Sequence, residues 1–176
     1  AKLIEALLQD TLPAYVRVGR NPVEDIYEEE GPFIMGKANW LAGKGKEADV
    51  ALIACGEMTK SALDAVSLLK KEGIRASLLD MYCVKPLDEQ AVLRAAETGL
   101  IITVEEHSPY GGLGSMVAQL TAKEAPCRVI NLTLPDAPVV TGKTQVIFDY
   151  YGLNAENIVK VATTEKENCK HVHIVN

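Results

Sequence analysis

Two glutamates and a histidine, Glu105, Glu106 and His107, follow directly after the apolar run 100–104. Carboxylates beside an imidazole tune its pKa, so this triplet could carry general acid–base chemistry. The same residues could instead cap the next helix or contact another subunit. Because neither a nucleophile nor a cofactor motif stands beside them, the sequence favours the structural role, and we predict no catalytic residue in this chain.

A glycine-rich turn comes next and opens a predicted helix, whose first amides could hold an anion. The turn contains three glycines and a serine: Gly111, Gly112, Gly114 and Ser115. It is not a P-loop, and Val117 stands where a dinucleotide fingerprint would need its third glycine. Two interpretations stay open: an interface or anion site that includes Glu106 and His107, or close packing of the strand against the helix.

Arg17 and Arg20 lie at the end of a predicted strand over residues 14–18. A guanidinium at a strand end suits bidentate binding of a phosphate or carboxylate. The arginines could equally pair with acids of the following segment, such as Glu24 or Asp25. The residues alone do not decide between these two roles.

No metal site is predicted. His171 and His173 supply only two ligands, and a tail strand or a loose end is the favoured interpretation. The aspartates Asp64, Asp80 and Asp136 are expected only to form caps and turns. The four cysteines contain no CxxC pair and predict neither a disulfide framework nor a zinc site. They are Cys55, Cys83, Cys127 and Cys169.

Composition excludes several classes of function. The formal net charge of −6 argues against binding nucleic acid, since that affinity comes mostly from basic residues on phosphates. No apolar run approaches the ~20 residues that span a bilayer, and the first residues lack the features of a secretory signal. A hydrophobic content of 48% is typical of a globular protein, and we expect a cytoplasmic location without nucleic-acid or membrane partners.

Elements that could position these residues alternate between strand and helix from residue 33 onward. A helix over 2–8 precedes the strand 14–18, and the acidic, proline-containing segment 21–32 is a predicted linker. Thr59 and Asp88 are predicted helix N-caps, and Gly73 a left-handed C-cap. Such alternation predicts a mostly parallel sheet with helices on both faces, whose ligands gather at the carboxyl ends of the strands. The predicted strands are 33–41, 49–55, 74–81, 100–104 and 128–134, and the last helices are 145–150 and 155–162.

Seven short motifs in order and spacing resemble the transketolase family, specifically its C-terminal section or subunit. They are 15–20 (YVRVGR), 36–38 (GKA), 49–58 (DVALIACGEM), 62–65 (ALDA), 85–88 (KPLD), 105–115 (EEHSPYGGLGS) and 151–153 (YGL). The resemblance implies a three-layer α/β/α sandwich around a five-stranded mixed, mostly parallel sheet whose first strand is antiparallel. It also implies a division of the chain into 1–20 (end of the pyrimidine-binding domain), 21–32 (linker), 33–163 (C-terminal domain) and 164–176 (tail).

The resemblance further implies transfer of a two-carbon ketol unit between sugar phosphates. Thiamine diphosphate and Mg²⁺ would bind outside this chain, because the family's GDG…N motif is absent from it. Arg20, assisted by Arg17, would bind the substrate phosphate. The expected partners are an N-terminal transketolase portion or subunit and a second copy in a homodimer. The alternatives are the corresponding part of a 1-deoxyxylulose-5-phosphate synthase or 2-oxoacid dehydrogenase beta subunit, or a free-standing regulatory or binding module.

Overall fold

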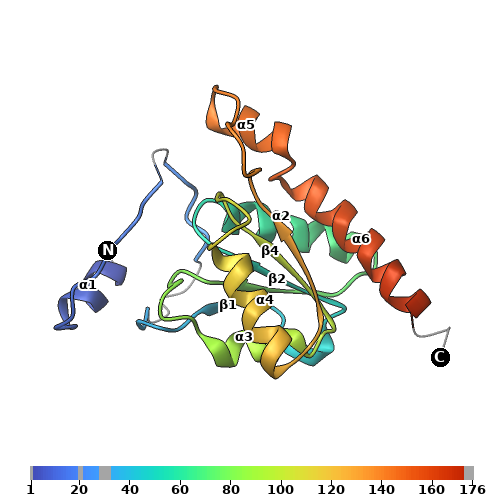
Figure 1. Cartoon of the computed structure of the whole chain (residues 1–176), viewed down its shortest axis with the longest axis horizontal. Helices are drawn as coiled ribbons and strands as arrows, with labels where there is room; N and C mark the ends of the chain where they lie inside the picture. Colours follow the sequence, from blue (N-terminus) through green and yellow to red (C-terminus); the bar gives the residue numbers. More distant parts are fainter. Residues whose placement is uncertain (1, 20–21, 28–32, 173–176) are drawn as a thin grey trace.

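The computed structural model describes residues 2–19, 22–27 and 33–172, and places a five-stranded sheet between two layers of helices (Figure 1). The strand order is β1-β3-β2-β4-β5, with β1 antiparallel to β3 and every other neighbouring pair parallel. The predicted three-layer α/β/α fold and the antiparallel first strand are confirmed. The strands are β1 (Asn39–Ala42), β2 (Val50–Ala54), β3 (Ala76–Asp80), β4 (Leu100–Val104) and β5 (Arg128–Leu132).

The central strands β2 and β4 are buried on both faces, which explains their uninterrupted apolar sequences. Leu52 of β2 packs in the core that includes α2 and α6, whereas Ile53 packs in the core that includes α3 and α4. Each of these fully buried side chains contributes roughly 1.5–3 kcal/mol of hydrophobic stabilisation. The helices around the sheet are α2 (Met58–Lys71), α3 (Glu89–Ala96), α4 (Leu113–Glu124), α5 (Thr144–Tyr151) and α6 (Ala155–Val172).

The helix caps follow the sequence at two positions and depart from it at a third. The Asp88 carboxylate accepts a hydrogen bond from the Ala91 amide (3.1 Å) and caps α3, as predicted. Gly73 adopts the predicted left-handed conformation (φ 74°) after α2. The prediction that Thr59 caps α2 is wrong, because the helix has already begun at Met58. The Thr59 hydroxyl instead donates to a buried carboxylate on β3.

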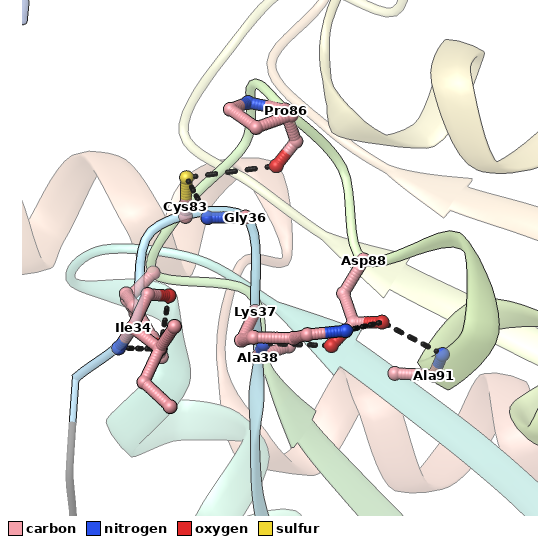
Figure 2. A network of polar contacts seen from close by, with 9 residues as sticks. Ile34, Gly36, Lys37, Ala38, Cys83, Pro86, Asp88 and Ala91 are labelled. Atoms are coloured by element: carbon pink, nitrogen blue, oxygen red, sulfur yellow. Dashed lines mark hydrogen bonds and ion pairs between the residues drawn. The ribbon is translucent and has the colours of Figure 1, made fainter. Parts of the chain in front are cut away.

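Strand β1 is shorter than the predicted run 33–41, because residues 33–38 form a loop that is hydrogen-bonded across the end of the sheet (Figure 2). In Figure 2 the Gly36 amide donates to the Cys83 sulfur (3.2 Å), and the Ala38 amide donates to Asp88 (3.1 Å). Lys37 lies 3.9 Å from the same Asp88 carboxylate. These contacts fix the loop that leads into β1.

The N-terminal segment contains the predicted helix α1 (Lys2–Leu8), which buries no residue and lies apart from the sheet in Figure 1. The predicted strand 14–18 is wrong for this chain: these residues form no secondary structure, and Tyr15 is 91% exposed. Their β-branched and aromatic composition favours a strand only where a neighbouring strand and a packed face are present. In the described part of the chain, residues 14–18 pair with no strand of the five-stranded sheet.

Helix α6 continues to Val172, so the predicted helix end at residue 162 is wrong, and residues 164–172 are helical rather than a separate tail. Polar contacts, not an apolar stripe, hold this extension. Glu165 forms an ion pair with Arg128 at the start of β5, and Lys166 lies 3.3 Å from Asp49 before β2. The helix therefore includes His171, whereas His173 lies outside the described residues.

Candidate functional site at the carboxyl edge of the sheet

The parallel strands β3, β2 and β4 end at one edge of the sheet, where the residues after them come together. The register pairs Ala54 of β2 with Asp80 of β3 on one side and with Val104 of β4 on the other. Four acids therefore gather at this edge: Asp80, Glu57 after β2, and the pair Glu105 and Glu106 that follows β4. This is the edge at which parallel α/β sheets bind ligands.

Glu105, the first acid after β4, is only 3% exposed and binds the beginning of α4. Its two carboxylate oxygens accept hydrogen bonds from the amides of Leu113 (2.8 Å) and Gly114 (2.7 Å). A carboxylate in this position satisfies two donors that a helix leaves unpaired and complements the positive end of its dipole. These two amides thus hold an anion that belongs to the chain itself, and an external anion there would have to displace Glu105.

The glycines of the turn are required by this close approach. A Cβ at Gly112 would lie 2.3 Å from the Glu105 carboxylate, and a Cβ at Gly114 would lie 2.5 Å from the Asn131 side chain. Ser115 closes the turn: its hydroxyl donates to the Pro109 carbonyl (2.8 Å) and accepts from the Gly111 amide (3.1 Å). Of the two uses left open by the sequence, this geometry supports packing of the strand against the helix.

The next two residues of the triplet face outward. Glu106 lies 3.9 Å from Arg17 of the N-terminal segment, and their side chains are 29% and 66% exposed. Burial raises the pKa of Glu106, Arg17 lowers it, and Glu57 raises it. The His107 side chain is exposed, while its carbonyl accepts from the Leu134 amide (2.9 Å).

Residues 17–19 therefore run along the carboxyl edge. A Cβ at Gly19 would lie 2.1 Å from a carboxylate oxygen of Glu57, so the backbone of this glycine sits directly against that side chain. Arg17 does form an ion pair, one of the two roles that the sequence left open, but its partner is Glu106 rather than Glu24, which lies 3.4 Å from Lys60. Arg20, the other predicted phosphate ligand, lies outside the described residues.

Asp80 is the site residue that sequence reasoning missed. It is nearly buried, and its carboxylate accepts hydrogen bonds from the hydroxyls of Tyr27 and Thr59. Asn39 of β1 donates to the Tyr27 oxygen (3.3 Å), so residues 22–27 are bonded to the end of the sheet. Burial raises the pKa of Asp80, although the two hydrogen bonds lower it. A carboxylate at the end of an apolar strand run was the only signal for this role in the sequence.

Cys55, which follows β2, is not an activated nucleophile. Burial, assisted by the nearby Glu105 and Asp80 carboxylates, raises its pKa to about 12. The thiol is thus fully protonated near neutral pH, whereas a nucleophilic cysteine needs a lowered pKa.

The described residues contain no group of three or more His, Cys, Asp or Glu side chains that could hold a metal ion. In the same part of the chain, no helix is both long and apolar enough to cross a membrane. The geometry of this edge is therefore that of a mixed α/β sheet whose strand-end acids bind other parts of the same chain.

Sequence comparison identifies the family to which this arrangement belongs. The profile of the family described as "Transketolase, C-terminal domain" matches residues 36–158. The chain belongs to this transketolase C-terminal domain family.

Individual relatives agree with this assignment. The chain is 45% identical over 163 residues to an apulose-4-phosphate transketolase subunit of Phocaeicola vulgatus, covering 92% of this chain and 51% of that protein. It is also 42% identical over 117 residues to a 1-deoxy-D-xylulose-5-phosphate synthase of Heliobacterium modesticaldum, covering 65% of this chain and 18% of that enzyme.

A solved structure agrees in fold and sequence. It is described as "Split gene transketolase, inactive beta4 tetramer" and superposes with a TM-score of 0.83 at 34% identity, covering 93% of this chain and 53% of that one. The chain thus spans about half the length of its subunit-type relatives.

Proposed function

We propose that this chain is the C-terminal part of a transketolase, an enzyme that transfers a two-carbon ketol unit between sugar phosphates. Thiamine diphosphate and Mg²⁺ would bind in the other part of the enzyme and supply the carbanion chemistry. Two observations support this division. The sequence lacks the GDG…N motif, and the first amides of α4 are bound by Glu105 rather than offered to a diphosphate.

We propose further that Arg17 and Arg20 bind the substrate phosphate. The observation that carries this proposal is the position of Arg17: it lies at the ligand-binding edge of the sheet, with its guanidinium 66% exposed beside Glu106. A partly exposed guanidinium beside a carboxylate keeps donors available for a phosphate. The catalytic residues would belong to the other part of the enzyme.

The proposed partners follow from the exposed apolar side chains of the N-terminal segment. We propose that residues 1–20 complete the pyrimidine-binding domain of an N-terminal portion or subunit, that 21–32 is the linker, and that the domain from residue 33 supports a homodimer. The exposed Leu8 and Tyr15 of the N-terminal segment support this proposal, since a stable protein rarely leaves such a stretch uncovered. The exposed His107 and Tyr110 would contribute to the subunit contact. Sugar-phosphate metabolism in the cytoplasm, such as the pentose phosphate pathway, is the proposed setting.

Reconstitution with the upstream portion tests these proposals. We expect ketol transfer to need both parts, thiamine diphosphate and Mg²⁺, and we expect the isolated chain to show no heat of binding with the cofactor in calorimetry. Arg17→Ala should raise KM for an aldose phosphate about tenfold or more, because a hydrogen bond to a charged group contributes roughly 1.5–3 kcal/mol. Arg75→Ala is the matched control, since Arg75 is an exposed arginine that precedes β3 at the opposite edge. Saturable cofactor binding to this chain alone would contradict the proposed division.

The second candidate is the corresponding part of a 1-deoxyxylulose-5-phosphate synthase, which the similarity to such an enzyme supports. The same reconstituted enzyme distinguishes the two reactions by its donor. A ketose phosphate donor would support transketolase, and a 2-oxoacid donor would support the synthase.

A further inference from the structure

We propose that Glu106 is a positioning residue, whose carboxylate orients the Arg17 guanidinium toward the substrate phosphate. This inference rests on the proposed phosphate-binding role of Arg17 and adds to it a residue of the C-terminal domain. Glu106 would act only through Arg17 and would not touch the substrate.

The relative exposure of the two side chains gives the direction of the interaction. Glu106 is the more buried partner (29% exposed) and Arg17 the more exposed one (66%), with Oε2 and Nη2 3.9 Å apart. The carboxylate therefore lies on the protein side of the guanidinium. The remaining donors of the planar guanidinium fork stay available to an anion in solvent.

The backbone on either side of this pair is also fixed at the edge. Gly19 lies against the Glu57 carboxylate so closely that a Cβ would overlap it. Further along, Glu24 pairs with Lys60 of α2, and the Tyr27 hydroxyl bonds to the buried Asp80. With the segment held at these points, the remaining freedom of Arg17 is in its side chain, and the ion pair with Glu106 restricts that freedom.

A restraint of this kind has an energetic consequence for binding. An arginine side chain loses substantial rotamer entropy when a ligand immobilises it, so a partner that pre-orders it improves affinity without a new contact. Glu106 is also an acid near the expected phosphate, and its like charge would oppose binding if it were not neutralised by Arg17. The pre-ordering effect therefore requires Arg17: Glu106→Gln should raise KM only while Arg17 is present, and without Arg17 the removal of the like charge should leave KM unchanged or lower it.

A double-mutant cycle in the reconstituted enzyme tests the inference. The variants are Glu106→Gln, Arg17→Ala and the double variant, assayed with D-glyceraldehyde 3-phosphate and with unphosphorylated D-glyceraldehyde as acceptors. We expect Glu106→Gln to raise KM for the phosphorylated acceptor two- to fivefold, the range of partly exposed ion pairs, with kcat unchanged. KM for glyceraldehyde should not change, and in the Arg17→Ala background Glu106→Gln should not raise KM for the phosphorylated acceptor any further.

The control is Glu47→Gln, which makes the same change of charge at an exposed residue before β2, at the opposite edge of the sheet. If Arg17→Ala raises KM for the phosphorylated acceptor but Glu106→Gln does not, the positioning role is refuted and the phosphate site stands. An equal effect of Glu106→Gln on both acceptors, or an undiminished effect without Arg17, also refutes it. If Arg17→Ala itself leaves that KM unchanged, the phosphate site is refuted, and the role of Glu106 falls with it.

Discussion

Replacing Glu105 by glutamine should destabilise the fold although the two side chains have nearly the same size. In the native chain both carboxylate oxygens accept from the first amides of α4, at 2.8 and 2.7 Å. The amide of glutamine keeps one acceptor oxygen but places an NH₂ group against the other backbone N–H. One charge-assisted hydrogen bond is lost, and a buried donor is left unpaired.

The magnitude follows from these two changes. A hydrogen bond to a charged group contributes about 1.5–3 kcal/mol, and burying an unpaired donor costs about 1–3 kcal/mol, part of which is the same loss. We therefore expect Glu105→Gln to lower the free energy of unfolding by about 2–3 kcal/mol. With a urea m value of roughly 2 kcal/mol/M, the unfolding midpoint should fall by about 1 M.

Urea unfolding followed by circular dichroism measures this shift, with Glu47→Gln as the control that should leave the midpoint unchanged. Native-state hydrogen exchange adds a local measurement. The amides of Leu113 and Gly114 should exchange faster in Glu105→Gln than in the wild type, beyond the change in global stability. An unchanged midpoint together with unchanged protection of these two amides would refute the assigned capping role.

Three further perturbations test other parts of the structure. Gly114→Ala should lower the free energy of unfolding, measured by thermal unfolding, by about 1–3 kcal/mol, because its Cβ would overlap the Asn131 side chain. The control Gly142→Ala, whose Cβ would make only ordinary contact, should leave the stability nearly unchanged. Equal losses of stability in the two variants would contradict this packing. Because the pKa of Asp80 is raised in the folded state, the fold gains stability as pH falls through that raised pKa toward the ordinary value of an aspartate, and loses it as pH rises through the raised pKa. In urea unfolding, the wild type should therefore gain stability relative to Asp80→Asn as the pH is lowered from 7 to 4. A difference in free energy of unfolding that stays constant over this range would contradict the raised pKa of Asp80. Because burial and nearby carboxylates raise the pKa of Cys55 to about 12, iodoacetamide at pH 8 should leave this residue unmodified until the chain is unfolded in urea, as peptide mass spectrometry would show.

Much of the fold could be predicted because its signals are local. The strand 100–104 matches β4 residue for residue, since a run of four apolar residues and one threonine, bounded by glycine and glutamate, marks a strand covered on both faces. Asp88 was found as a helix cap because capping depends on residues three positions apart. The glycine turn was located correctly for the same reason.

What the sequence did not predict depends on contacts between distant segments. The Tyr27 hydroxyl reaches Asp80 across 53 positions, and no local pattern indicates which hydroxyl will meet a given carboxylate. The Thr59 hydroxyl donates to the same buried acid, whereas local capping rules had predicted Thr59 as the N-cap of α2. The last turns of α6 were missed because ion pairs hold them, whereas the prediction relied on apolar periodicity.

The distribution of charge at the carboxyl edge bears on the alternative of a free-standing module that binds an anion there. Three carboxylates described at this edge each have a partner from another part of the chain: Asp80 accepts from Tyr27, Glu105 from the start of α4, and Glu106 pairs with the N-terminal segment. An anion bound directly among these acids would meet like charges and would have to break existing contacts. A phosphate held on the outer side of Arg17 meets neither obstacle. The edge is therefore better suited to hold the chain's own N-terminal segment, with the proposed phosphate ligand Arg17 exposed to solvent, than to bind an anionic ligand by itself.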